Sequence, residues 1–189
     1  YGLRANRPTR VDCELIESQN ALIRSLIEQG GSYRVVGWGI GQFSEGEPSV
    51  TREAMPKSEN QDERTKAARK PGEIGISWLG TDEEAEEEPQ DAPQPYLLEN
   101  QLFAHHGEIE AFDAIRARMV EAIHEEYLDD IEDAGDSAHL FHLIRSLRRA
   151  EASLPGNEVL RRSMHRVIEW SAQLEPDSDL TANLLWTDG

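Results

Sequence analysis

Cysteine and long apolar runs are scarce in this chain of 189 residues. The single cysteine, Cys13, excludes an internal disulfide framework and is typical of a protein in a reducing cytoplasm, which is the location we expect. No apolar run is long enough for a transmembrane helix, and the polar stretch from Tyr1 to Arg10 lacks the apolar core of a signal peptide. The length predicts one domain, or at most two small ones, with enough residues for a proper core.

Basic residues are also few, because 19 Lys and Arg stand against 37 Asp and Glu and give a formal net charge of −18. Partners such as nucleic acids and anionic membranes need a basic surface, so both are excluded. No Lys or Arg occurs between Lys70 and Arg116, whereas seven acidic residues lie from Asp82 to Asp91 alone. With its prolines, the stretch at about 81–95 predicts a solvated acidic loop rather than a cation site.

The spacing of apolar residues predicts strands near both ends of the chain and helices between them. Strands are expected at 1–5 (ended by Pro8), 34–43, 73–79 and 180–186, with a turn at 44–48 and a hairpin formed by 96–98 and 101–106. Helices are expected from Asp12 to Gly30, over 112–126, from Asp136 or Ser137 onward and over 157–174, while 57–72 is polar and helical or loose. This order indicates an α+β or layered α/β fold rather than a regular βαβ repeat.

The strand Arg34–Phe43 carries glycines at every second position around Trp38, namely Gly37, Gly39 and Gly41. Alternating glycines weaken a strand unless another segment must approach its backbone closely. We therefore expect such an approach here, and we expect Trp38 to pack in the core.

Five motifs follow one another along the chain. They are YGLRANRPT at 1–9, GWGIG at 37–41, FAHHG at 103–107, GDSAHLF at 135–141 and LLWTDG at 184–189. In this order they resemble the class II glutamine amidotransferases, specifically the small stand-alone branch that includes γ-glutamyl hydrolases of ergothioneine synthesis and glutathione breakdown. The resemblance implies the N-terminal-nucleophile hydrolase fold, an α+β four-layer αββα sandwich, with residues 1–189 forming a single domain of this type.

The activity implied by the resemblance is hydrolysis of a γ-glutamyl amide, either glutamine or another γ-glutamyl compound, through a thioester on an N-terminal Cys. The free α-amino group of that Cys titrates near neutrality and serves as the base. Stand-alone relatives begin with Met-Cys-Arg-Leu before an aromatic residue and Gly, which Tyr1 and Gly2 match. The nucleophile is therefore expected upstream of Tyr1. Asp188-Gly189 is a hairpin-turn signal inside a family hairpin, so the fold is expected to be incomplete at both ends.

The resemblance also assigns the candidate site residues. Asp136 matches the family acid that binds the substrate ammonium. His106 and Gly107 match the oxyanion hole, with His106 in place of the family Asn; a neutral His still donates one hydrogen bond. Gly75 stands where the family has an Arg for the substrate α-carboxylate, and Val36 where an Asp is usual. The implied partner is a small γ-glutamyl substrate, with no cofactor and no metal, and the oligomeric state is not predicted.

Taken singly, these residues also have plain structural interpretations. Asp136 or Ser137 could cap the N-terminus of a helix. His105 could be a hydrogen-bonded core histidine, and Cys13 a small buried residue without a catalytic role. His139 and His142 could be ordinary surface and boundary residues.

Two other functions remain open at this stage. The first is a pseudoenzyme that keeps the fold as a binding or assembly module after losing the Arg and the Asn. The second is a metal-dependent hydrolase using Asp136, His139 and His142, with His105 and His106 nearby. Positions i, i+3 and i+6 of a helix do not share one face, however, so we expect no metal site.

Overall fold

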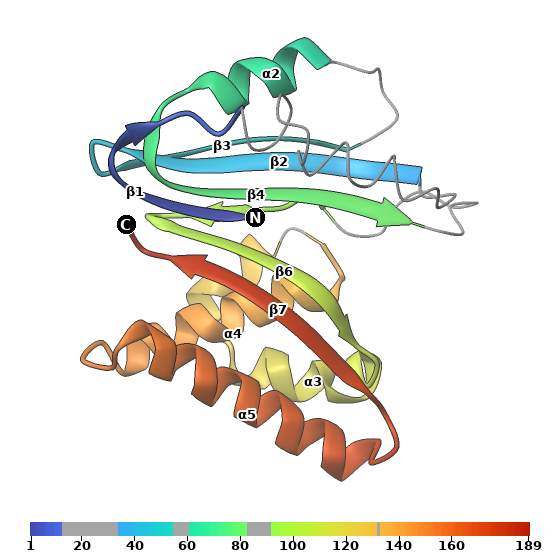
Figure 1. Ribbon diagram of the computed structural model, residues 1–189. Helices are drawn as coiled ribbons and strands as arrows, with labels where there is room; N and C mark the ends of the chain where they lie inside the picture. Colours follow the sequence, from blue (N-terminus) through green and yellow to red (C-terminus); the bar gives the residue numbers. More distant parts are fainter. Residues whose placement is uncertain (13–33, 55–60, 83–91, 132) are drawn as a thin grey trace. The chain divides into compact units, whose positions relative to one another are not determined.

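The computed structural model describes residues 1–12, 34–54, 61–82, 92–131 and 133–189 (Figure 1). The chain divides into two compact units, the first made of Tyr1–Ala104 with Leu185–Gly189 and the second of His105–Leu184. Three features singled out in the sequence lie outside the described residues: the helix expected to follow Asp12, the residue Cys13, and residues 83–91 of the acidic loop. Within the described ranges, no helix has the length and apolar character needed to cross a membrane.

Two sheets make up the β-structure. The first has the order β1-β4-β2-β3, with strands β1 (Gly2–Thr9), β4 (Gly72–Asp82), β2 (Arg34–Ser44) and β3 (Glu47–Ala54), all paired antiparallel. The second has the order β5-β6-β7, with strands β5 (Tyr96–Leu98), β6 (Gln101–Ile109) and β7 (Leu180–Thr187). Strands β6 and β7 each pass from one unit into the other. The predicted strands are therefore confirmed, with small differences at their ends.

The turn between β2 and β3 has the geometry expected from the sequence. Ser44 pairs with Glu47, and the two residues between them, Glu45 and Gly46, have φ angles of 54° and 85°. Positive φ at both central residues is the arrangement that suits the twist of a two-residue hairpin. Strand β1 differs from expectation because it continues through Pro8, although its register with β4 breaks between Arg4 and Thr9. Since β1 is an edge strand, a proline there need not remove a ladder hydrogen bond.

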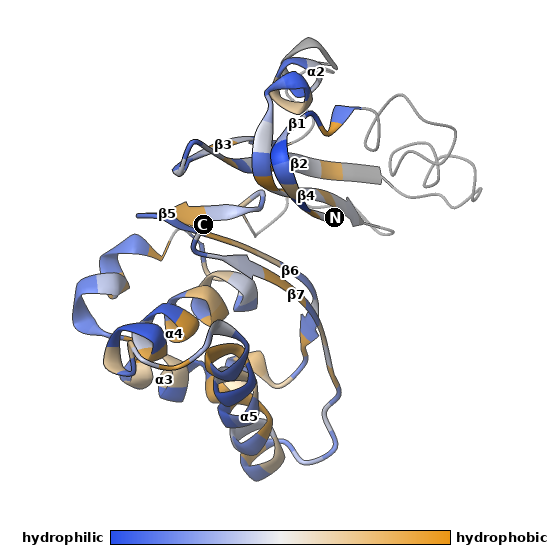
Figure 2. Cartoon of the chain, turned by 60° about the vertical axis from the view of Figure 1, so that its left-hand side comes forward, coloured by the Kyte–Doolittle hydropathy of each residue, from blue (hydrophilic) through white to orange (hydrophobic). Residues whose placement is uncertain are grey.

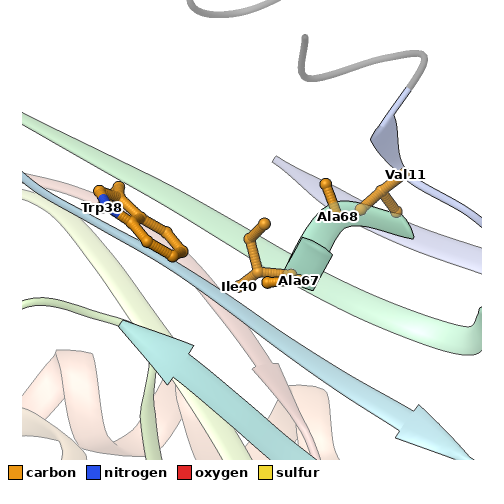
Figure 3. Close-up of a cluster of buried hydrophobic side chains, with 5 residues drawn as sticks. All are labelled: Val11, Trp38, Ile40, Ala67 and Ala68. Carbon is orange, nitrogen blue, oxygen red and sulfur yellow. The ribbon is translucent and has the colours of Figure 1, made fainter. Parts of the chain in front are cut away.

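Trp38, Ile40 and Gln42 of β2 face helix α2 (Gln61–Arg69). Trp38 and Ile40 join Val11, Ala67 and Ala68 in one buried cluster (Figure 3). Trp38 is therefore a core residue, as expected from the sequence. The cluster explains why the polar helix α2 holds its place, since its two alanines allow a close approach to the sheet.

Gly37, Gly39 and Gly41 of β2 face the segment that leads into β5. A Cβ on Gly39 would overlap the carbonyl oxygen of Gln94, and one on Gly41 would lie 2.8–2.9 Å from side-chain atoms of Leu102 and Pro95. The predicted close approach to this strand is confirmed. Its cause is that the backbone at 93–95 crosses β2 where no side chain intervenes.

An arginine from the neighbouring strand fixes this crossing segment. Arg52 of β3 lies opposite Gly39, and its Nη1 donates hydrogen bonds to the carbonyl oxygens of Pro93 (3.2 Å) and Pro95 (3.5 Å). Its guanidinium also lies over the ring of Tyr96, 5.8 Å from the centroid. The glycines thus allow the segment at 93–95 to approach β2 closely, and the hydrogen bonds from Arg52 hold it there.

The second unit contains three α-helices, whose alternating polar and apolar residues are coloured in Figure 2. They are α3 (Phe112–Ala122), α4 (Asp136–Ala150) and α5 (Gly156–Leu174), with a 3-10 helix η2 (Glu125–Asp130) after α3. The helix expected over 112–126 therefore ends earlier, because Ile123 and His124 are extended. Helix α4 is buried without interruption from Ser137 to Leu147.

The buried residues of α4 include polar and charged side chains. His139 and His142 are each only 3% exposed, so their interpretation as surface or boundary residues is wrong. Arg145 is 1% exposed, and its guanidinium lies 3.9 Å from the centroid of the Tyr127 ring and 3.4 Å from His142 Nδ1. Burial, followed by the Arg145 charge, lowers the pKa of His142 to about 4. The histidine is therefore neutral at pH 7.

We expect Gly39→Ala to destabilise the protein by about 2–4 kcal/mol, because the new methyl group would overlap the Gln94 carbonyl. Gly75→Ala is the matched control in the same sheet, since its Cβ would have no neighbour closer than 3.7 Å. Denaturant unfolding measures both variants. Equal losses of stability in the two would show that β2 is not crossed closely at Gly39.

Acid should weaken the fold through His142. The unfolded chain takes up a proton near pH 6.5, whereas folded His142 does so only near pH 4, so its contribution is complete above pH 6.5 and is lost as the pH falls to about 4. The loss is at most about 3 kcal/mol. Urea unfolding at pH 4–7 should show a smaller loss with acid in His142→Gln than in the parent chain. Identical pH slopes would contradict the assignment.

Candidate functional site

The candidate site lies in the second unit, where the start of α4 meets the end of β6. Gly135 is the N-cap of α4, without a side-chain cap, and Asp136 is the first helical residue. The interpretation of Asp136 or Ser137 as the N-cap is therefore wrong. The Asp136 carboxylate is instead held in a tertiary contact, because its Oδ2 accepts the backbone N–H of Ile109 at 2.9 Å.

Two neighbours complete the surroundings of this carboxylate. The Ser137 hydroxyl lies 3.1 Å from Asp136 Oδ1 and donates to it. The same hydroxyl oxygen lies 2.9 Å from Nδ1 of His105, whose Nδ1 is 3.9 Å from Asp136 Oδ1. The Asp136 side chain is 13% exposed, whereas His105 and Ser137 are almost fully buried. The carboxylate is thus the accessible end of a buried polar group of three.

The charge state of His105 depends on opposing effects. Burial lowers the pKa of His105, while the Asp136 carboxylate and a hydrogen bond with the Thr181 backbone raise it, and His106 lowers it. His105 is therefore a hydrogen-bonded core histidine, as one interpretation of the sequence held. Its burial and its contact with Ser137 tie it to the same group as Asp136.

The two predicted oxyanion-hole residues follow directly on β6. Gly107 has φ +148°, and a Cβ there would overlap the carbonyl oxygen of Thr181 on β7. His106 is exposed, and its carbonyl oxygen accepts a hydrogen bond from Asn183 Nδ2 at 3.2 Å. Gly107 lies two residues before Ile109, the residue that holds Asp136. The predicted positions 106, 107 and 136 therefore lie on adjoining segments of one unit, and their roles stay predictions.

The other positions singled out from the sequence belong to the first unit. Gly75 is buried in β4 opposite Leu3 and Gln42, and Val36 lies in β2. Tyr1 extends β1 along β4, where its carbonyl oxygen accepts the Ser77 N–H at 2.7 Å.

The histidines considered as metal ligands have separate partners. His139 Nδ1 lies 2.7 Å from the Gly135 carbonyl oxygen, and its ring packs edge-on against Phe112. His142 instead lies beside Arg145. In the part of the chain that the structure describes, no group of three or more His, Cys, Asp or Glu side chains is placed to hold a metal ion.

Sequence reasoning missed two residues. Ser137 was considered only as a possible cap, although it bridges His105 and Asp136. Arg145 was not considered at all, although it is among the most buried side chains. The adjacency of Ser137 to Asp136 was the one available signal for the first, whereas nothing in the spacing of Arg145 distinguishes it from a surface arginine.

No protein-family model and no curated protein matches the chain by sequence. Solved structures do match it. A glutamine aminotransferase class-II domain protein from Silicibacter pomeroyi superposes with a TM-score of 0.62 at 18% identity, over 83% of this chain and 69% of that one. A protein from Pseudomonas aeruginosa described as a predicted glutamine amidotransferase gives 0.51 at 19% identity, over 100% and 68%.

A third match is the glutamine phosphoribosylpyrophosphate amidotransferase of Bacillus subtilis, in complex with ADP and GMP. It gives a TM-score of 0.58 at 13% identity over 98% of this chain, which spans 34% of that longer protein. The chain therefore has the α+β fold of class II glutamine amidotransferase domains. At these identities the likeness establishes the fold, and the chemistry must be argued from the residues.

Replacing Gly107 should damage the candidate site and the stability together. Gly107→Ala combines a positive φ with an overlap on the Thr181 carbonyl, so we expect a loss of about 2–4 kcal/mol. The control is Gly46→Ala, which has φ +85° but no atom within 4 Å of its Cβ, and should cost only about 1 kcal/mol. Thermal or urea unfolding measures the difference. A Gly107→Ala variant as stable as Gly46→Ala would mean that β7 does not approach this glycine.

Proposed function

We propose that this chain is a glutamine amidotransferase-type domain that binds a γ-glutamyl amide and hydrolyses it when an N-terminal Cys precedes Tyr1. The observation that carries the proposal is the placement of Asp136. In a fold shared with class II amidotransferase domains, its carboxylate is fixed to the backbone of β6 two residues beyond Gly107. This supports a site in which an acid and the proposed oxyanion donors serve one small substrate.

In the proposed reaction, the α-amino group of the N-terminal Cys takes the thiol proton and the thiolate attacks the amide carbon. The His106 side chain and the Gly107 backbone N–H stabilise the oxyanion, and Asp136 binds the substrate ammonium. Collapse of the tetrahedral intermediate breaks the C–N bond, and the protonated leaving group departs as ammonia or an amine. Water then hydrolyses the thioester and restores the thiol.

The proposed substrate differs from free glutamine because its α-carboxylate carries no negative charge. Gly75 places no cation where relatives are expected to carry an Arg, and Asp136 and the net charge of −18 both repel a carboxylate. We therefore propose weak binding of L-glutamine and tighter binding of a γ-glutamyl amide whose α-carboxylate is neutralised. The pseudoenzyme alternative rests on the same two departures, Gly75 and His106, and differs in predicting binding without hydrolysis.

The test compares residues 1–189 alone with the same chain preceded by Met-Cys-Arg-Leu, from which removal of the initiator Met leaves an N-terminal Cys. Ammonia release and calorimetric binding are measured with L-glutamine and with L-glutaminamide, which lacks the α-carboxylate. We expect both forms to bind glutaminamide more tightly, and only the Cys-bearing form to release ammonia. Asp136→Asn should lower kcat/KM about 10- to 100-fold, since it removes a charged hydrogen-bond partner. Asp113→Asn, an exposed acid in the first turn of α3, is the control.

Each other outcome has a definite meaning. Binding without ammonia release in the Cys-bearing form would support the pseudoenzyme. Ammonia release by residues 1–189 that Cys13→Ala abolishes would place the nucleophile at Cys13. Equal effects of Asp136→Asn and Asp113→Asn would remove Asp136 from the site.

A further inference from the structure

The buried group behind Asp136 has a property that the proposed function does not use. Ser137 Oγ lies within hydrogen-bonding distance of two groups, Asp136 Oδ1 at 3.1 Å and His105 Nδ1 at 2.9 Å. A serine hydroxyl has one proton to donate. It cannot donate to both at once, so the direction of this chain of hydrogen bonds depends on whether His105 Nδ1 carries a proton.

Two protonation states of His105 are compared, namely the imidazolium, whose Nδ1 carries a proton, and the neutral imidazole with its single proton on Nε2. When Nδ1 is protonated, it donates to Ser137 Oγ and the hydroxyl donates to Asp136, which gives a continuous chain from the imidazole to the carboxylate. When Nδ1 is unprotonated, it accepts the Ser137 proton and Asp136 Oδ1 loses this donor, while Oδ2 keeps the Ile109 N–H. In the second arrangement Asp136 has more free acceptor capacity and no imidazolium 3.9 Å away.

We propose that Ser137 and His105 are positioning residues that make the affinity of Asp136 for a cationic ligand group depend on the proton of His105. A proton on His105 and an ammonium on Asp136 then compete, because each is attracted by the same carboxylate. By linkage, the proton on His105 lowers the affinity for the ligand by the same factor as the bound ligand lowers the affinity of His105 for its proton. The identity of the ligand rests on the proposed function, whereas the coupling within the three residues does not.

The other groups around His105 define its electrostatic surroundings. His106 follows it on β6, and Asp136 acts on it from the start of α4. His139, one turn further along α4, is itself influenced by Asp136. Thr181 of β7 contributes backbone only. Arg116 of α3 and Asp133 act on His139. Burial lowers the pKa of His105 below the ordinary value of a histidine. The Asp136 carboxylate opposes this effect, because it favours the protonated imidazole.

The first experiment follows the His105 imidazole by NMR titration without ligand. Asp136→Asn should lower the pKa of His105 because the favourable carboxylate is lost. Ser137→Ala should also lower it, since the charge-assisted chain is interrupted, and Ser137→Thr should restore it. Ser171→Ala is the control, because the hydroxyl of this buried serine of α5 donates to the Val167 carbonyl of its own helix. An unchanged His105 pKa in Ser137→Ala would overturn the proposal.

The second experiment measures binding of L-glutaminamide at two pH values, one below and one above the pKa that the NMR titration gives for His105. Affinity should be at least about fivefold weaker at the lower pH in the parent chain, and independent of pH in His105→Gln. A pH dependence that persists in His105→Gln would overturn the proposal. Absence of binding at either pH, together with the expected NMR changes, would leave the relay established and overturn the proposed function instead.

Discussion

The hydrogen bond from the Ile109 N–H to the Asp136 carboxylate joins the first residue of α4 to the strand that carries His105, His106 and Gly107. A half-buried carboxylate is stable in such a place because two donors, one backbone and one hydroxyl, satisfy part of it. An ionised carboxylate has about four acceptor positions, so two donors leave capacity for a further partner. Binding of a substrate ammonium by Asp136 depends on that remaining capacity.

The rest of α4 shows how a helix with many polar residues can be the centre of a unit. Arg145 lies against Tyr127 and beside His142, and Ser146 accepts the His124 N–H while donating to the His142 carbonyl. These contacts join η2 to α4. Burial, followed by the Arg145 charge, lowers the pKa of His142 and keeps it neutral at pH 7. Helix α4 therefore begins with a partly exposed carboxylate and has a buried, acid-sensitive middle.

The sequence was informative where one local rule decides the structure. The glycines of β2 predicted a close approach, and the backbone at 93–95 provides it; the Glu45-Gly46 turn and helix α5 follow from residue type and periodicity. The sequence was not informative where contacts with residues distant in the chain determine the environment of a side chain. The N-cap interpretation of Asp136 could not anticipate a bond to Ile109, 27 residues earlier, and periodicity could not show that His139 and His142 are covered. The site residues came from the motif order, because no local rule assigns an ammonium to Asp136.

The most direct measurement of the central claim is chemical-shift mapping of the isotopically labelled chain as L-glutaminamide is added. If Asp136 and β6 form the ligand site, the largest changes will fall on the backbone amides of His106, Gly107, Ile109 and Ser137 and on the Asp136 carboxyl carbon. Saturable changes confined to other residues, with these five unaffected, would contradict the account.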